Sequence, residues 1–338
     1  MNIKIRNSFL HGFILTFFNL ATSYTGMLKF MLHMEQDNSK FYLQMFKPWE
    51  LVLNTIFYLM GAGLVVYFGK EIDWGLLFKG LGLVTVIQIA GSSLSSVYAQ
   101  MESGYTFRKE FDLLKPDDPR NLGRIRMTNG LLVTISSLGM VTIFIIDLTR
   151  NDLINSTGYL FIGIAIILLL IYSIPPFRAI RRGYGEVILA IEGAYLFPTI
   201  SYLLQTDEIH RILIFIAIPL SLLYLSMEMT RSLNEYSNKP LEKKSGSMIS
   251  YLGPQNGLQV INLMILAAYL VVGVEGLLGL SSLIIWRFLL TLPVGFFLIW
   301  QISQLREGRK PNWQLLELTS IFMVGLTAYF VAMGLWLG

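Results

Sequence analysis

Hydrophobic residues fill long stretches of this chain, and short polar segments separate them. From Trp49 onward, nine of these stretches are long enough to cross a bilayer as helices, which takes about 20 residues each. None of them alternates between apolar and polar positions as a membrane β-strand does. The pattern therefore predicts an all-α, multi-pass membrane protein. We place its spans near residues 49–68, 74–98, 128–147, 154–173, 186–204, 211–232, 257–274, 280–301 and 314–337.

The first 47 residues follow a different pattern. On a helical wheel, one side of residues 8–34 is polar and the rest is largely apolar, which is typical of an amphipathic helix lying in the membrane interface. A tenth span is the alternative. We therefore divide the chain into an N-terminal interfacial segment, 1–47, and a nine-helix domain, 48–338. The polar stripe consists of His11, Asn19, Thr22, Thr25, Lys29 and His33.

The linkers predict the orientation of the domain. The loops after the second, fourth, sixth and eighth predicted spans carry 16 lysine and arginine residues, whereas the opposite side carries four. Positively charged loops stay on the cytoplasmic side of membrane proteins. We therefore expect these four long loops, and any site that they cover, to face the cytoplasm.

Composition agrees with a protein built into a lipid bilayer. The 338-residue chain is 54% hydrophobic and 14% charged, with a mean hydropathy of +0.58. In soluble domains, about a quarter of the residues are charged. The net charge of +4 comes from the loops, so it indicates orientation and not nucleic-acid binding. The absence of cysteine excludes disulfides, thiolate catalysis and iron–sulfur ligation. The three histidines are far apart in sequence, which argues against a histidine-based zinc or haem site.

The segment Tyr172–Glu186, between the fourth and fifth predicted spans, has the most distinctive chemistry of the chain. Two consecutive prolines end the preceding helix, and two glycines loosen the backbone before Glu186 opens the next helix near its positive dipole end. A short basic hairpin of this kind can hold a phosphate group. The alternative is a loop whose positive charge only sets the topology. Its arginines are Arg178, Arg181 and Arg182.

The order of residues in this segment resembles a known loop. Tyr-Ser-x-Pro-Pro, then basic residues, then Arg-Gly-x-Gly-Glu, is similar to the loop after the fourth helix of the UbiA superfamily of intramembrane prenyltransferases. Ile180 stands where many members have a lysine, and Arg181 lies beside it. The resemblance implies a nine-helix UbiA-like bundle over residues 48–337. It also implies transfer of an isoprenoid chain from a prenyl diphosphate to a lipophilic acceptor, such as a quinone precursor or another lipid.

In that family, an aspartate-rich motif closes the second helix and another closes the sixth. Paired carboxylates hold the diphosphate through Mg²⁺, a hard cation that prefers oxygen ligands. In the first motif of this chain, Tyr98, Ser103 and Gly104 fit the family frame. The expected aspartates are replaced by Val97, Gln100 and Thr106. Gln100 can offer one neutral oxygen, and the nearby carboxylates are Glu102, Glu110 and Asp112.

The second motif is altered to a similar degree. If Arg231 keeps the family arginine, Ser232 and Tyr236 replace its aspartates, and a shifted register offers Glu228, Asn234 and Glu235 instead. The polar residues Ser221, Tyr224, Glu228, Arg231 and Glu235 share one face of the sixth helix, and Gln88, Ser92, Ser96 and Gln100 share one face of the second. Polar residues inside a membrane commonly line a cavity; for the serines, helix–helix hydrogen bonding is the preferred interpretation.

The resemblance and these faces together predict a cavity at the cytoplasmic ends of the second, fourth, fifth and sixth helices. A divalent ion or an arginine should lie between its carboxylates, because two facing carboxylates would otherwise repel each other. The candidate catalytic residues are Glu102, Glu228 and Glu235. The candidate substrate-binding residues are Tyr98, Gln100, Tyr172, Arg178, Arg181, Arg182, Glu192, Arg231 and Asn234. The candidate Mg²⁺ ligands are Gln100, Glu102, Glu228, Asn234 and Glu235.

Glu192, two turns into the fifth helix, lines the cavity or pairs with an arginine.

Two other functions of the same fold remain open. The missing aspartates favour a catalytically degenerate protein of the same fold that binds a lipid or a partner protein, and an isoprenoid cyclase is a further relative. An unrelated transporter is disfavoured, because the spans lack the paired, broken helices of a midplane site. The sequence names neither the acceptor nor a protein partner.

Overall fold

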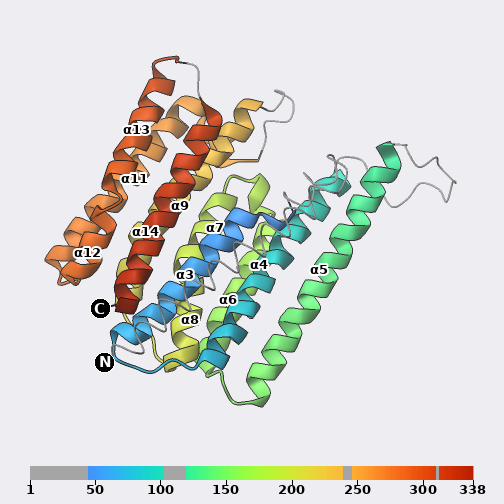
Figure 1. Ribbon diagram of the computed structural model, residues 1–338. Coiled ribbons are helices and arrows are strands. Elements are labelled where there is room, and N and C mark those ends of the chain that lie inside the picture. Colours follow the sequence, from blue (N-terminus) through green and yellow to red (C-terminus); the bar gives the residue numbers. More distant parts are fainter. Residues whose placement is uncertain (1–44, 103–118, 239–245, 310–311, 338) are drawn as a thin grey trace.

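The computed structural model describes residues 45–102, 119–238, 246–309 and 312–337, which are helical and contain no strand within these ranges. Nine candidate spans cross the described bundle, as the hydrophobic pattern predicts (Figure 1). The predicted amphipathic helix, 8–34, lies outside the described residues. The spans are α3 (Pro48–Tyr67), α4 (Trp74–Glu102), α5 (Pro119–Arg150), α6 (Ser156–Ser173), α7–η2–α8 (Gly185–Ile191, Glu192–Leu196 and Phe197–Thr206), α9 (Ile212–Asn238), α11 (Pro254–Leu277), α12–α13 (Ser282–Leu289 and Leu292–Arg306) and α14 (Trp313–Leu337).

Helix α3 lies at the centre, because it contributes to two hydrophobic cores. One core joins it to α9, α11, α13 and α14, and the other joins it to α4, α6 and α8. Gly61 lets α3 approach α8 so closely that a Cβ atom there would overlap the backbone of Pro198. At the far end of α14, Trp336 Nε1 donates to the carbonyl of Leu59 on α3 at 3.0 Å. This central position places the first residues of α3 where the other helices converge.

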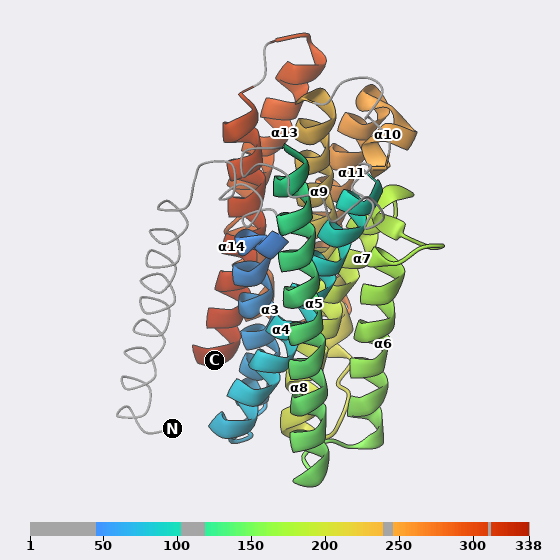
Figure 2. The ribbon, with the colours of Figure 1, turned by 90° about the vertical axis from the view of Figure 1, so that its right-hand side faces the viewer.

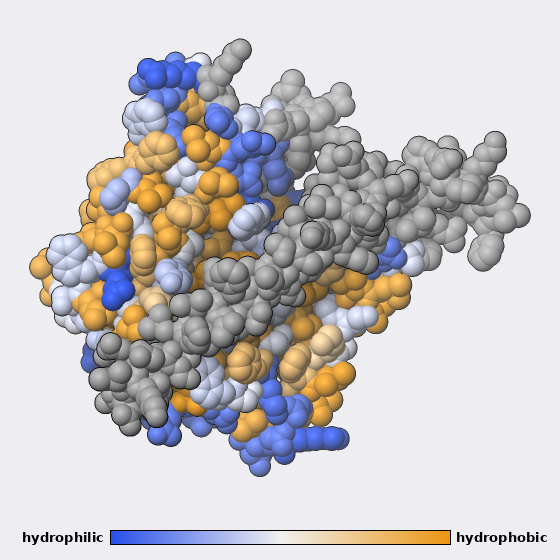
Figure 3. Space-filling model, in the orientation of Figure 1, coloured by the Kyte–Doolittle hydropathy of each residue, from blue (hydrophilic) through white to orange (hydrophobic). Residues whose placement is uncertain are grey.

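Helix α5 stands at the edge of the bundle and packs mainly on α4 (Figures 1 and 2). Thr134 Oγ1 donates to Ser93 Oγ across this contact at 2.9 Å, and Lys79 pairs with Asp147 at 2.6 Å. Much of the rest of α5 is exposed. In Figure 3 hydrophobic residues cover the middle of the molecule and hydrophilic residues gather toward its two ends. That distribution is what a bundle surrounded by lipid requires.

Two spans are interrupted, which the hydrophobic pattern did not predict. The fifth span contains the π-helical turn η2, Glu192–Leu196, and such turns are frequent at functional sites. The eighth span breaks between α12 and α13, where Thr291 Oγ1 bonds to Phe288 O and Thr327 Oγ1, both at 2.8 Å. Helix α5 also begins before the predicted residue 128, because polar residues continue the same helix beyond the apolar stretch.

Candidate functional site

Charged residues from three spans meet at one end of the bundle, the end at which α4, α6, α9 and α13 finish. We call it the long-loop end (Figure 1). Lys47 and Glu50 come from the start of α3, Glu228 and Arg231 from α9, and Glu317 from the first turns of α14. We refer to these five residues as the ion cluster. The three spans that carry these residues are far apart in the chain, so only the folded bundle brings them together.

Arg231 is the centre of the ion cluster. Its Nη1 donates to Glu50 Oε1 at 3.1 Å and to Glu228 Oε1 at 3.0 Å, and its Nε lies 3.4 Å from Glu317 Oε1. Glu50 and Glu228 are almost fully buried, whereas 21% of the Arg231 side chain is exposed. Burying a carboxylate is tolerated only when it is paired and hydrogen-bonded. The guanidinium therefore holds two buried carboxylates of different helices together.

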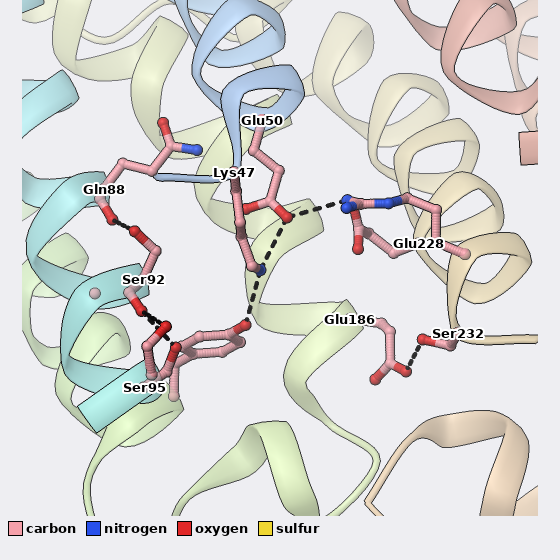
Figure 4. Close-up of polar contacts among 12 residues, drawn as sticks. Lys47, Glu50, Gln88, Ser92, Ser95, Glu186, Glu228 and Ser232 are labelled. Carbon is pink, nitrogen blue, oxygen red and sulfur yellow. Dashed lines mark hydrogen bonds and ion pairs between the residues drawn. The ribbon is translucent and has the colours of Figure 1, made fainter. Parts of the chain in front are cut away.

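Lys47 extends the ion cluster toward α6. Its backbone is left-handed, with φ of 41°, immediately before Pro48 at the first helical position of α3. Its Nζ lies 2.9 Å from Glu50 Oε1 and donates to the Tyr172 hydroxyl at 3.2 Å (Figure 4). Burial is the strongest single influence and alone would lower the pKa of the Lys47 ammonium, but Glu50, Tyr172 and Glu228 together more than offset it and raise that pKa above its usual value. Lys47 is therefore a permanent cation beside Tyr172.

Tyr172 lies in the last turn of α6 and begins the arginine-rich segment of the sequence. Arg178 is buried and left-handed, with φ of 36°, and it precedes the single 3₁₀ turn η1, Ala179–Arg181. The side chains of Arg181 and Arg182 are exposed. We call residues 174–184 the arginine loop. It lies at the long-loop end, next to the ion cluster through the contact between Tyr172 and Lys47.

Glu186 fixes the arginine loop to its neighbours. Its Oε1 accepts hydrogen bonds from Ser232 Oγ of α9 at 2.7 Å and from the backbone nitrogen of Met248 at 3.1 Å, where α10 (Met248–Leu252) begins (Figure 4). The Tyr251 hydroxyl of α10 donates to the carbonyl of Arg181 at 3.4 Å. The Glu186 carboxylate thus joins the start of α7, directly after the arginine loop, to α9 and to the start of α10, so the arginine loop is held in place over the bundle.

A second group of polar side chains lies deeper in the bundle. Asn54 of α3, Glu192 of η2 and Tyr224 of α9 are buried, and within the described residues Asn54 Oδ1, Glu192 Oε1 and the Tyr224 hydroxyl have no hydrogen-bond partner. Gly193 lies among them, because a Cβ atom there would come 2.7 Å from Asn54 Oδ1 and 3.2 Å from the Tyr224 ring. We call Asn54, Glu192 and Tyr224 the inner polar group. Buried polar atoms without partners are rare and point to a role other than packing.

The predicted site residues have different surroundings in the structure. Glu228 and Arg231 come together directly, and Asn234 donates to Glu317 at 2.9 Å. Glu235 is exposed near the end of α9, and Tyr98 is half-buried on α4. Gln100 and Glu102 lie at the end of α4, but their side chains are outside the described part of the structure, so their predicted role stays a prediction.

Arg231 lies between Glu228 and two carboxylates that were not foreseen, Glu50 and Glu317. The predicted partner of Glu228 across the cavity, Glu102, has its side chain outside the described part of the structure, so an ion or arginine between those two stays a prediction. Glu228 was among the candidates, but Glu50, Lys47 and Glu317 were not. All three lie where a span begins at the long-loop end, where charge is ordinarily read as a membrane-interface signal. One signal was available: Lys47 and Glu50 are three residues apart across a proline that starts a helix. The serines of the predicted polar face of α4 differ from the expectation of helix–helix hydrogen bonding, since Ser92 and Ser96 donate to carbonyls of their own helix.

The fold and its buried polar residues define an integral, multi-pass membrane protein whose charged site lies at one end of a helical bundle. The model of the UbiA prenyltransferase family matches residues 54–326, which is most of the 338-residue chain. The protein therefore belongs to the UbiA prenyltransferase family. No curated protein matches the chain.

Several solved structures share the fold. A structure from work on digeranylgeranylglyceryl phosphate synthase in membranes is 12% identical, with a TM-score of 0.60, and the match covers 90% of this chain and 100% of that one. A UbiA homologue from Archaeoglobus fulgidus, bound to GPP and Mg²⁺, is 17% identical with a TM-score of 0.59, over 86% and 99% of the two chains. The apo UbiA homologue from Aeropyrum pernix K1 is 14% identical with a TM-score of 0.50, over 84% and 96%.

Proposed function

We propose that this protein is a membrane prenyltransferase that moves an isoprenoid chain from a prenyl diphosphate to a lipophilic acceptor. The observation that carries the proposal is the contact between Lys47 and Tyr172, which joins the ion cluster to the end of α6, where the arginine loop follows. Cations and hydrogen-bond donors are thereby gathered at one end of an apolar bundle. A prenyl diphosphate needs both environments, because its head is an anion and its chain is a hydrocarbon.

In this proposal the arginine loop binds the diphosphate. Arg181 and Arg182 are exposed at the long-loop end, and the planar guanidinium fork binds phosphate oxygens in pairs. Glu186 holds the loop against α9 and α10, so little loop entropy remains to be lost on binding. The Lys47 ammonium beside Tyr172 adds a fixed positive charge near the start of the loop. The charge of the departing diphosphate is stabilised by these groups.

The inner polar group is assigned to the acceptor. Buried polar atoms that lack a protein partner favour a ligand that brings its own hydrogen-bonding groups. The Glu192 carboxyl can accept a proton or a hydrogen bond from a hydroxyl of the acceptor, and the Tyr224 hydroxyl and Asn54 Oδ1 can orient that group. Glu192, a predicted substrate-binding residue, is thus proposed to contact the acceptor.

A divalent ion, when bound to a diphosphate, neutralises its charge and makes it a better leaving group. The described residues of this chain do not offer such an ion a free set of ligands, since no metal-ligand group is found among them and the buried carboxylates of Glu50 and Glu228 are bonded to Arg231. Glu228, the predicted ligand with the most buried position, bonds to Arg231 instead. We therefore place Mg²⁺ with the substrate's phosphates, and assign the chain's own contribution to its arginines and Lys47.

We also propose that the long-loop end faces the cytoplasm. The support is the predicted distribution of 16 positive residues on this side against four on the other.

A second candidate function is a UbiA fold that binds a lipid or a partner without prenyl transfer. The specific observation in its favour is that the buried carboxylates Glu50 and Glu228 are already neutralised by Arg231 and Lys47. Such a protein would bind an isoprenoid and leave it unchanged. A cyclase relative would change the isoprenoid without joining it to an acceptor.

One assay separates these functions. Purified protein in lipid nanodiscs is given prenyl diphosphates of several chain lengths, Mg²⁺ and a lipid extract as the source of acceptor, and pyrophosphate and lipid products are measured. A transferase releases pyrophosphate and adds the mass of the prenyl chain to a lipid. Release without such an adduct would identify a cyclase or hydrolase. Binding without release would establish the degenerate function and contradict the proposal.

A further inference from the structure

The carboxylates of the ion cluster are arranged around a guanidinium and not around a metal. Glu50 Oε1 and Glu228 Oε1 both accept from the same atom, Arg231 Nη1, and Glu317 Oε1 lies against Arg231 Nε. Three carboxylates from α3, α9 and α14 thus surround one side chain. We call Glu50, Glu228 and Glu317 the carboxylate triad.

We propose that Arg231 is an internal cation that takes the place of a divalent metal ion within the carboxylate triad. The inference rests on the proposed function, because it concerns how the charge of that same site is balanced, but it can be tested without any substrate. It states that the protein holds its carboxylates together without Mg²⁺, and that a metal site is exposed only when Arg231 is removed.

The charges of the ion cluster support this assignment. Two cations, Lys47 and Arg231, face the three carboxylates of the triad, which leaves one negative charge in a partly buried site. Without Arg231 the same group would carry three negative charges against one positive charge. That imbalance matches the charge of a divalent ion, which carboxylate oxygens bind well.

The geometry shows why arginine suits this position better than lysine. A guanidinium carries donors along several edges in one plane, so it reaches Glu50 and Glu228 through Nη1 and Glu317 through Nε at the same time. A lysine ammonium is a point charge on a flexible stem. Moreover, the arginine is tied covalently to α9, so it cannot be removed by a chelator as a bound ion can.

The test measures thermal unfolding of the full-length protein in nanodiscs after treatment with EDTA, with and without added Mg²⁺ or Mn²⁺. For the unmodified protein, the metal is expected to leave Tm unchanged. For Arg231→Gln, Tm without metal falls, and saturating metal raises it again by about 3 °C because the ion binds only the folded triad. Arg306→Gln, an exposed arginine at the end of α13, is the control and gains no metal response.

A second measurement keeps the inference falsifiable if Arg231→Gln does not fold. Electron paramagnetic resonance of Mn²⁺ reports metal binding to the unmodified protein directly. Either no Mn²⁺ binding or binding that Glu228→Gln leaves unchanged supports an occupied triad. Binding that Glu228→Gln abolishes would overturn the inference, as would a folded Arg231→Gln protein whose Tm does not respond to metal. Because no prenyl diphosphate is used, either result is independent of the transfer assay.

Discussion

Arg231 on α9 and Glu50 on α3 are 181 residues apart in sequence, yet Arg231 Nη1 donates to Glu50 Oε1 at 3.1 Å. The same nitrogen donates to Glu228 Oε1, one turn earlier on α9, at 3.0 Å. The contact joins the two helices that both contribute to the larger hydrophobic core. It makes the charge balance of the site a property of the tertiary structure.

This relationship predicts strong coupling between Arg231 and Glu228. Arg231→Gln leaves the buried Glu228 carboxylate without its guanidinium partner, and we expect this variant to lose about 3 kcal/mol of stability. Glu228→Gln leaves Arg231 paired with Glu50 and Glu317, so we expect it to lose less. The double variant Arg231→Gln/Glu228→Gln should lose less than the sum, by about 1–3 kcal/mol. A double-mutant cycle of denaturant or thermal unfolding in detergent measures this difference. Additive losses would mean that the 3.0 Å contact contributes no coupling.

The inner polar group predicts a sharp difference between two glycines. Gly193→Ala places a Cβ atom 2.7 Å from Asn54 Oδ1 and 3.2 Å from the Tyr224 ring, and overpacking of this kind typically costs about 1–3 kcal/mol. Gly163→Ala on α6 is the matched control, since a Cβ atom there meets nothing within 4 Å. The Tm of purified protein should fall for Gly193→Ala and should not fall for Gly163→Ala. Equal Tm values would show that Gly193 is not closely packed against Asn54 and Tyr224.

The orientation of the bundle can be measured readily, because the chain has no cysteine of its own. Ser237 is exposed near the end of α9, at the long-loop end, and Asp152 is exposed in the turn between α5 and α6. In intact cells, a membrane-impermeant thiol reagent added outside should label Asp152→Cys and leave Ser237→Cys unlabelled until the cells are opened. The reverse pattern would place the arginine loop outside the cytoplasm.

Much of the fold follows from the sequence, because the feature that determines it is local. Each span is a continuous apolar stretch, so hydropathy alone places all nine spans of the described bundle. The break at Thr291 is different, because the hydroxyl of Thr327, on another helix, bonds to Thr291 Oγ1 there. The π-turn that begins at Glu192 likewise lies inside an uninterrupted apolar stretch of sequence.

The site is predictable only in part, because its partners meet through tertiary packing. The arginine loop and the face of α9 that carries Glu228 and Arg231 are visible as sequence patterns. Two further members of the ion cluster, Lys47 and Glu50, lie at a helix start, and apart from their three-residue spacing across Pro48 nothing local distinguishes them from interface charges. Their role follows from the central position of α3, which a hydropathy pattern cannot give.

The arginine loop predicts how substitutions divide between substrate binding and scaffold. Arg182 is exposed on the loop, so Arg182→Ala should weaken binding of a prenyl diphosphate by about 10-fold, the loss of one charge-assisted contact. Glu228 is paired internally with Arg231, so Glu228→Gln should weaken it less. Equilibrium binding to each folded variant measures both constants. A larger loss for Glu228→Gln would assign the diphosphate to the carboxylate triad instead of the arginine loop.

The most direct test of the central claim is equilibrium binding of prenyl diphosphates to the purified, unmodified protein in nanodiscs. Geranyl, farnesyl and geranylgeranyl diphosphate are titrated with and without Mg²⁺, and the matching prenyl alcohols serve as controls that share the chain and lack the phosphates. We predict saturable binding of at least one diphosphate, much tighter than that of its alcohol, because the arginine loop recognises the anionic head. No measurable affinity for any of the three, with or without Mg²⁺, would contradict the proposed prenyltransferase function.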